Sequence, residues 1–145
     1  MKIREAQKKD INELYALGKK IRELSFSKKL HFHEKLELAE FIKNSKENIF
    51  LVAEDKKELI GFLFAKILSH HAGGWCMLDN LAVEQKHRKK GVGTKLLREL
   101  YKRIKKKKIH YIQILEEEHH KKTRAFWKSK GYKETTHFVW AEKIV

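Results

Sequence analysis

The chain has 145 residues, 41% of them hydrophobic, which predicts a single domain with one core over residues 1–145. Lysine and arginine (34) outnumber aspartate and glutamate (19), so the formal net charge is +15 and favours polyanionic partners. No run of about 18 apolar residues is present, which excludes a membrane-spanning helix, and the single cysteine excludes an internal disulfide. Because no signal-peptide block follows Met1, we expect a cytoplasmic protein that is a monomer or a homodimer.

The N-terminal part of the sequence predicts one strand and two helices. The strand is predicted at Lys2–Ala6. Asp10 is expected to cap the first helix, because a short carboxylate side chain can accept hydrogen bonds from the first N–H groups. Apolar residues recur at helical spacing in that helix, namely Ile11, Leu14, Leu17, Ile21 and Leu24. A second helix is predicted from about His33 to Lys43.

The middle of the sequence predicts three strands. Ile49–Glu54 and Leu59–Leu68 are apolar runs on either side of the polar turn Asp55–Glu58, and this pattern predicts a hairpin. His70–Gly74 is expected to be a loop, and Trp75–Val83 is the next strand.

The C-terminal part predicts helix, strand, helix and one or two final strands. A helix reaching about Lys106 has one apolar side, formed by Leu96, Leu97, Leu100, Tyr101 and Ile104. The strand Ile109–Leu115 follows it, and the helical connection is long enough for parallel pairing with Trp75–Val83. His120–Lys130 is predicted to be a short helix stopped by Gly131, and Tyr132–Ile144 to be one or two strands. The fold class is therefore α/β (α+β), a mixed sheet covered by helices.

A basic turn with two glycines joins the strand Trp75–Val83 to the following helix. Its sequence, His87 to Thr94, is His-Arg-Lys-Lys-Gly-Val-Gly-Thr. Glycines let the backbone turn tightly and approach a ligand, and the free N–H groups of a helix start favour a phosphate. A plain strand-to-helix turn is the alternative. Leu96 stands where a dinucleotide fingerprint needs a third glycine, and the Gly-Lys-Ser/Thr of a Walker loop is absent.

Three segments carry a resemblance to a known family. They are Ile3–Ala6 with Asp10-Ile11, Leu81–Val83 with Arg88–Gly93, and Ala125–Tyr132. The second is similar to an Arg/Gln-x-x-Gly-x-Gly/Ala motif after a strand, and the third to an aromatic-Tyr-x-x-x-Gly-Phe motif. In this order they resemble the GNAT family of acetyl-CoA-dependent N-acetyltransferases over essentially the whole chain. The resemblance implies a mixed, mostly antiparallel central sheet of six to seven strands, flanked by about four helices and splayed at its central parallel pair.

The resemblance also implies a cosubstrate, acetyl-CoA, whose acetyl group moves to a primary amine of a small molecule, a peptide or a protein. Backbone N–H groups would hold its pyrophosphate, and they belong to Arg88, Lys89, Lys90, Gly91, Val92, Gly93 and Thr94. Backbone groups of Leu81, Ala82 and Val83 would pair with the pantetheine arm. His120 is expected to hydrogen-bond that arm, and Trp127 either packs against it or belongs to the core.

In this family the amine attacks the thioester directly, which requires a proton acceptor, an oxyanion donor and an acid. Asp79 is the candidate general base, acting through a water, or it orients the substrate ammonium. A backbone N–H near Leu81 is the expected oxyanion donor. Trp127 stands where the family often has a tyrosine acid, and an indole N–H is not a usable acid. The acid is left open among Tyr132, His119, His120 and water.

The acceptor pocket is expected, by family analogy, around Ser25–His33 and Thr135–Trp140. These segments supply aromatic and histidine side chains, namely Phe26, Phe32, His33, His137, Phe138 and Trp140. The positive charge argues against a polyamine acceptor and favours one that carries acidic or phosphate groups, or an acidic peptide terminus.

Other readings of the sequence are a nucleic-acid-binding module and an acyl-CoA-binding domain without catalysis. The first would use Lys86–Lys90 and Lys102–Lys108, but no helix-turn-helix or aromatic RNA platform accompanies them. No metal site is expected, because the pairs His70-His71 and His119-His120 lack helical ligand spacing and a partnered carboxylate pattern. Cys76 is expected to pack in the core.

Overall fold

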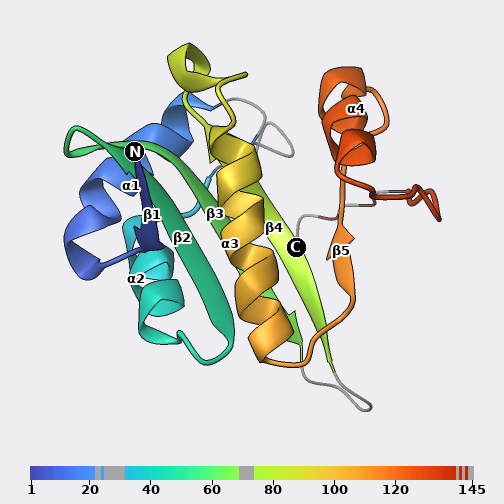
Figure 1. Ribbon diagram of the computed structural model, residues 1–145, viewed down its shortest axis with the longest axis horizontal. Coiled ribbons are helices and arrows are strands. Elements are labelled where there is room, and N and C mark those ends of the chain that lie inside the picture. The colour runs from blue at the N-terminus through green and yellow to red at the C-terminus, as the bar shows by residue number, and fades with distance from the viewer. Residues whose placement is uncertain (22–23, 25–31, 69–73, 140, 142, 144–145) are drawn as a thin grey trace. The chain divides into compact units, whose positions relative to one another are not determined.

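The computed structural model describes residues 1–21, 24, 32–68, 74–139, 141 and 143 of the chain (Figure 1). Contacts group the chain into two compact units, Met1–Ile114 and Leu115–Val145. The first unit holds the sheet and three helices, and the second holds one helix.

A five-stranded sheet forms the centre of the first unit. Its strands lie side by side in chain order, and they are β1 (Lys2–Glu5), β2 (Asn48–Asp55), β3 (Glu58–Leu68), β4 (Trp75–Val83) and β5 (Ile112–Ile114). Every neighbouring pair is antiparallel except β4 and β5, which are parallel. The structure therefore confirms the α/β class and the mixed, mostly antiparallel sheet with one parallel pair.

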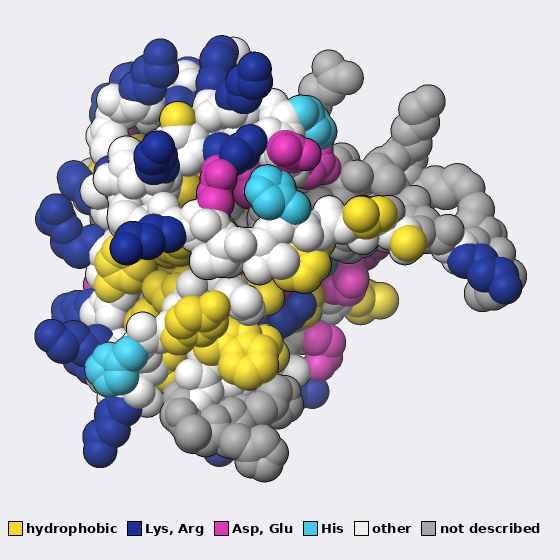
Figure 2. All heavy atoms as spheres, turned by 90° about the vertical axis from the view of Figure 1, so that its right-hand side faces the viewer, with side chains coloured by type: hydrophobic (Ala, Val, Ile, Leu, Met, Phe, Trp, Pro, Cys, Tyr) yellow, Lys and Arg dark blue, Asp and Glu magenta, His cyan; other side chains and the backbone are white. Residues whose placement is uncertain are grey.

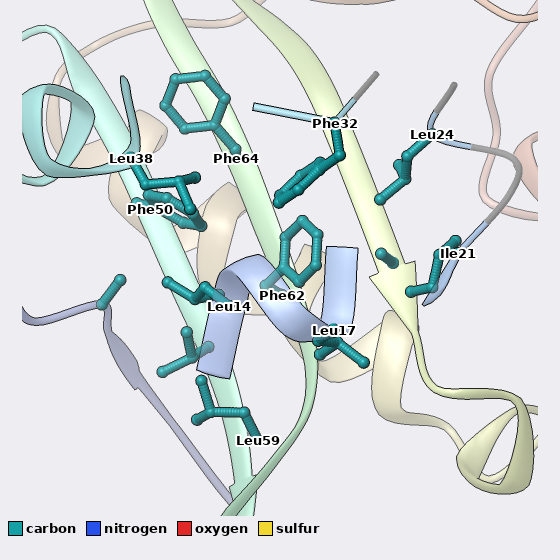
Figure 3. Packing of buried hydrophobic residues seen from close by; sticks show 13 residues of the cluster. Leu14, Leu17, Ile21, Leu24, Phe32, Leu38, Phe50, Leu59, Phe62 and Phe64 are labelled. Carbon is teal, nitrogen blue, oxygen red and sulfur yellow. The ribbon is translucent and has the colours of Figure 1, made fainter. Parts of the chain in front are cut away.

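Helices cover both faces of this sheet. α1 (Ile11–Lys20) and α2 (Lys35–Lys43) lie on one face and α3 (Val92–Lys106) on the other, while α4 (Lys121–Ser129) belongs to the second unit (Figures 1 and 3). Phe62 and Phe64 both point from β3 toward α1 and α2, since residues two positions apart in a strand face the same side of the sheet. The same cluster includes Leu14, Leu17, Leu38 and Phe50 (Figure 3). Burying a side chain of this size stabilises the fold by about 1.5–3 kcal/mol.

Two helix predictions need correction. The first helix was predicted to reach Leu24, but α1 ends at Lys20 because Ile21 already has an extended backbone (φ −98°, ψ 97°). The apolar side of α3 does not include Tyr101, which is 36% exposed. The buried residues of that helix are Val92, Leu96, Leu97, Leu100 and Ile104.

The strand predictions for the C-terminal part were also too generous. Six to seven strands were expected, but the described residues form five, and residues 132–139 have no regular structure. The strands predicted in Tyr132–Ile144 are therefore missing from its described residues, where Phe138 is 75% exposed and Val139 94% exposed. A strand needs a ladder partner, and apolar content alone does not supply one. β5 is shorter than the predicted Ile109–Leu115, and at its start the N–H of Ile109 donates to Ile104 of α3 and not to a strand.

An ion-pair network around Arg4 connects β1, β2 and the start of α1. The prediction that Asp10 caps α1 is wrong: its carboxylate instead accepts two hydrogen bonds from Arg4, at 2.7 and 2.9 Å, and one from the N–H of Gln7. Arg4 also donates to Glu54. Burial pushes the pKa of Asp10 up, but these hydrogen bonds outweigh burial and hold it below its usual value. The network therefore stabilises the fold at neutral pH, and this contribution is lost as the pH falls through the lowered pKa.

Candidate functional site

The basic turn predicted from the sequence lies between β4 and α3. A short 3₁₀ turn, Gln85–His87, follows β4, and Gly91 occupies the position directly before the first residue of α3. Gly91 has φ 78° and ψ 4°, a left-handed conformation that glycine adopts without strain. The arrangement confirms that the segment His87–Thr94 is a turn leading into a helix and not part of a continuous helix.

The start of α3 presents unprotected N–H groups. No side chain caps this helix, and the first intrahelical bond runs from the N–H of Lys95 to the carbonyl of Gly91. A Cβ atom built on Gly91 would meet no atom within 4 Å, so the space beside it is open. First-turn N–H groups and the helix dipole together favour an anion at this position.

Two lysines of the turn have no ion-pair partner among the described residues, whereas Lys86 pairs with Glu84. Lys89 and Lys90 are exposed, and no described carboxylate lies within ion-pair distance of either. Arg88 has a structural task, because its Nε donates to the carbonyl of Val83 at 2.9 Å and so ties the turn to the end of β4. A polyanion bound here could accept hydrogen bonds from the backbone N–H groups and interact electrostatically with the exposed lysines.

The outer edge of β4 is free beyond the parallel pairing. The ladder with β5 runs over three residue pairs and ends where Leu78 faces Ile114. From Asp79 to Val83, β4 pairs only with β3 among the described residues of this sheet. The free edge includes Leu81, Ala82 and Val83, the residues expected to pair with a pantetheine arm. A strand edge of this kind can accept an extended ligand as an added strand.

A β-bulge at Asp79 turns two neighbouring side chains to the same face. Phe64 pairs with Asn80 and Ala65 with Leu78, so Asp79 is the extra residue in β4. Asp79 binds Lys66 at 2.9 Å, and Asn80 lies opposite Phe64, so both face the side of the sheet that carries α1 and α2. Bulges re-aim side chains next to binding sites, and this one lies where the ladder between β4 and β5 ends.

Lys66 was missed by the sequence reasoning. Its ammonium is 2.9 Å from Asp79 Oδ2 and lies over the rings of Phe41 and Phe64, at 5.7 and 5.6 Å from their centroids. The two rings stack at 4.3 Å. A lysine inside the otherwise apolar run Leu59–Leu68 was the available signal.

Asn80 was also missed. Its side chain is buried, with 6% exposed, and its Oδ1 has no hydrogen-bond partner among the described residues. A buried unpaired carbonyl is costly, so such an atom calls for a ligand or a water. An asparagine at a buried position of an apolar strand was the signal in the sequence.

Cys76 is a residue of the core. It is fully buried in β4, and burial together with the nearby charge of Asp79 raises the pKa of its thiol to about 12. A thiol of this kind is not a nucleophile at neutral pH, which agrees with the expectation of a core residue.

In the second unit, Trp127 is buried and contacts three side chains. Its indole N–H donates to Glu116 at 3.2 Å, and its ring packs edge-on against Phe126 and Tyr132. His120, directly before α4, lies with Nδ1 3.0 Å from Glu116 and Nε2 3.5 Å from Glu117. The contacts of Trp127 and His120 with the pantetheine arm stay predictions.

The pair His119-His120 has a carboxylate partner that the sequence pattern did not indicate. The sequence suggested no carboxylate partner for His119-His120, but Glu117 lies against both rings, 3.1 Å from His119 Nε2 and 3.5 Å from His120 Nε2. Local turn geometry, not helical spacing, brings the three side chains together. His70-His71 lies outside the described residues.

The residues expected to frame an acceptor pocket are only partly described. Phe26 and Trp140 lie outside the described residues. Phe32 belongs to the core, where it packs against Phe62. His33 packs edge-on against Phe41, next to the side chain of Lys66.

The exposed basic residues of the first unit follow α3. Lys95, Arg98, Lys102 and Lys105 recur at helical spacing on its exposed side, between the turn before α3 and Lys106–Lys108. The turn before α3 and the segment Lys102–Lys108 lie at opposite ends of this helix, which has 15 residues and is therefore roughly 20 Å long. A cleft of about 450 Å³ lies beside the segment Lys102–Lys108. Phe41, Ile42 and Phe50 form its apolar part, and its basic rim includes Lys102 and Lys106. In Figure 2, lysine and arginine side chains (dark blue) gather mostly on the left and upper parts of the face drawn. The nucleic-acid interpretation stays an untested alternative.

None of the described helices is long and apolar enough to cross a lipid bilayer.

Comparisons with known proteins place this geometry in context. The model of the acetyltransferase (GNAT) family matches residues 13–132. An aminoglycoside antibiotic 6'-N-acetyltransferase from Acinetobacter haemolyticus, solved without ligand, shares 20% identity and a TM-score of 0.78, covering 100% of this chain and 99% of that chain. A transcriptional regulator from Bacillus halodurans C-125 shares 18% identity and a TM-score of 0.83, covering 98% and 99%.

A third solved structure is an aminoglycoside N-acetyltransferase in complex with CoA. It shares 15% identity and a TM-score of 0.80, covering 99% of this chain and 100% of that chain. At these identities the structural likeness shows the fold alone. The comparison with curated proteins finds no significant match.

Proposed function

Because the chain belongs to the acetyltransferase (GNAT) family, we propose that it transfers the acetyl group of acetyl-CoA to a primary amine of a small molecule, a peptide or a protein. One observation carries this proposal: β4, with its free outer edge, leads through a left-handed glycine into the uncapped start of α3. The family supplies the reaction type, and this segment supplies a place for the cosubstrate.

The residues of the turn fit a diphosphate. The N–H groups of Gly91 to Thr94 would hold its oxygens, since no side chain occupies the helix start and the space beside Gly91 is open. Lys89 and Lys90 would add charge at the rim. The edge of β4 from Leu81 to Val83 would hold an extended arm through backbone hydrogen bonds. When bound, acetyl-CoA supplies the activated thioester.

Asp79 is our candidate for the general base. It lies at the bulge beside the free edge of β4, where its carboxylate, 24% exposed, can reach a water or the acceptor ammonium. Lys66 holds this carboxylate in place. The N–H near Leu81 is the candidate oxyanion donor. The buried thiol of Cys76 supports direct attack by the amine without an acyl-enzyme.

Asn80 is our candidate for a residue that positions the acceptor. Its unpaired Oδ1 is buried beside Asp79, so an acceptor N–H donated to it would satisfy an otherwise orphaned carbonyl. The indole of Trp127 is occupied by Glu116, and the proposal needs no side-chain acid because the coenzyme A thiolate is a fair leaving group.

The charge of the chain supports an acceptor that carries acidic or phosphate groups. The names of two structural neighbours refer to aminoglycosides, but a net charge of +15 would slow the capture of a polycation. An acidic small molecule or the N-terminus of an acidic peptide would be attracted instead.

Thiol release from acetyl-CoA, measured with a panel of amines, tests the proposal. The panel contains small acidic amines, peptides with free N-termini and an aminoglycoside. We expect thiol release that depends on an acceptor and is strongest with acidic acceptors. Stabilisation by acetyl-CoA without thiol release from any acceptor would instead indicate a non-catalytic acyl-CoA-binding domain. A larger, strongly salt-dependent stabilisation by nucleic acid would overturn the proposal.

A further inference from the structure

A cluster of histidine and glutamate side chains lies in the turn before α4, and it includes His120, which is also an expected contact of the pantetheine arm. Glu117, His119 and His120 each offer one ligand atom, and these three atoms lie within 4.8 Å of one another. The turn is closed by backbone bonds from His120 to Glu117 and from Lys121 to His119. Figure 2 shows histidine side chains (cyan) next to acidic ones (magenta) on one face of the molecule.

The distances within the cluster suit a small divalent cation. Glu117 Oε2 is 3.1 Å from His119 Nε2 and 3.5 Å from His120 Nε2. Ligand atoms bound at about 2.0–2.1 Å to a tetrahedral zinc ion are about 3.3 Å apart, so both separations match such an ion. Two imidazoles and one carboxylate are ligands that zinc prefers, and a water can fill the fourth position.

The surroundings of His120 provide the second contact that metal-binding histidines usually make. Its Nδ1 lies 3.0 Å from Glu116 Oε1, while its Nε2 faces Glu117. A neutral imidazole has only one N–H, so it cannot donate to both carboxylates. With the proton on Nδ1 bonded to Glu116, Nε2 is free to bind a metal beside Glu117.

Glu116 is itself held in place. Its second oxygen accepts the indole N–H of Trp127 at 3.2 Å, and Trp127 is buried. The two hydrogen bonds that link Trp127, Glu116 and His120 therefore fix the orientation of the His120 ring. An orienting carboxylate behind a histidine is the arrangement that tunes zinc sites in proteins.

The second unit also has little else to stabilise it. Among its described residues only Trp127 is a buried hydrophobic side chain. Short units with small cores commonly gain stability from a metal ion. We propose that Glu117, His119 and His120 bind one Zn²⁺, with Glu116 orienting His120, and that the ion clamps the turn that begins α4.

Zinc titration of the untagged protein against a chromophoric chelator tests this proposal, in the absence of acetyl-CoA. We expect saturable uptake of one Zn²⁺ per chain. His120→Ala and Glu117→Gln should each weaken zinc binding by more than tenfold. Glu116→Gln should weaken it by up to about 10–100-fold, because glutamine has only one carbonyl oxygen to accept from both His120 and Trp127. Exposed His110, which lies in the first unit, provides the control: His110→Ala should leave zinc affinity unchanged.

Two outcomes would overturn the proposal. One is the absence of stoichiometric uptake of Zn²⁺. The other is equal zinc affinity in wild type and His120→Ala. Circular dichroism of each variant identifies loss of folding, and Co²⁺ absorption gives a second readout: a protein-bound tetrahedral ion absorbs far more strongly than the aqueous ion. Thiol release is not part of the test, so the zinc site and the acetyltransferase proposal can fail independently.

Discussion

Two turns in this protein each lead into a helix, yet their chemistry is opposite. The turn before α3 is basic and offers backbone N–H groups, whereas the turn before α4 carries Glu116, Glu117 and two histidines. A helix start favours negative charge in both places. In the first turn that preference is left for an anionic ligand. In the second, glutamates of the chain already supply the negative charge, and the proposed ligand is a cation. If both proposals hold, the side chains around a helix start decide which ligand it binds.

The largest expected effect separates the two turns completely. Gly91→Glu should abolish acetyl-CoA binding, because its carboxylate would fill the open space at the start of α3 and repel the diphosphate. Wild type with acetyl-CoA at 100 times its Kd gains about 2.7 kcal/mol of stability, and the variant should gain none. Thermal unfolding with and without acetyl-CoA measures this difference.

Gly91→Ala is the matched control for that variant. Alanine brings the strain of a positive φ, about 1 kcal/mol, without a charge or a long side chain. It should lower the melting temperature and keep most of the stabilisation by acetyl-CoA, and zinc affinity should stay unchanged in both variants. If Gly91→Glu binds acetyl-CoA with wild-type affinity, the turn before α3 is not part of the cosubstrate site.

Asp79→Asn should lower turnover by about 100-fold or more while acetyl-CoA binding changes little. The amide keeps the shape of the side chain but cannot accept a proton. Thiol release with a fixed acceptor measures turnover, and Glu58→Gln, an exposed change of the same chemistry at the start of β3, provides the control. Wild-type turnover in Asp79→Asn at every pH would exclude this residue as the base.

Asn80→Ala should raise the KM for the acceptor by about tenfold, because the acceptor N–H loses its partner carbonyl. The KM for acetyl-CoA should stay at its wild-type value, since this side chain faces α1 and α2 and not the turn. Steady-state kinetics with each substrate varied in turn gives both constants. A change in the KM for acetyl-CoA alone would show that Asn80 does not position the acceptor.

The smallest effect concerns the exposed lysines of the first turn. Lys89→Ala and Lys90→Ala should each weaken acetyl-CoA binding by about fivefold at most, and the loss should shrink in high salt. Isothermal titration at two salt concentrations measures it. A loss as large as that of Gly91→Glu would mean that side-chain charge, not the backbone, holds the cosubstrate.

Backbone features of this protein could be predicted because they follow from local sequence. The glycine-punctuated turn, the amphipathic helix after it and the hairpin of β2 and β3 all reflect spacing within a short segment. The structure confirms these elements and adds that Gly91 has a left-handed conformation.

Features that depend on distant partners could not be predicted. The bulge at Asp79 and the pairing with Lys66 require the register of β3 against β4. The network of Arg4, Asp10 and Glu54 joins residues far apart in the chain, so a local capping rule gave the wrong partner for Asp10. The cluster at Glu117 was missed for a different reason: it is local, but it forms in a turn, where helical ligand spacing does not apply.

The central claim is that backbone N–H groups at the start of α3 hold the diphosphate of acetyl-CoA, and ¹H–¹⁵N NMR spectra recorded during a titration with acetyl-CoA test it most directly. The account predicts that the amide signals of Gly91, Val92, Gly93 and Thr94 move furthest, with the proton shifts expected of new hydrogen bonds. If acetyl-CoA binds while these four signals stay in place and others move, the claim is contradicted.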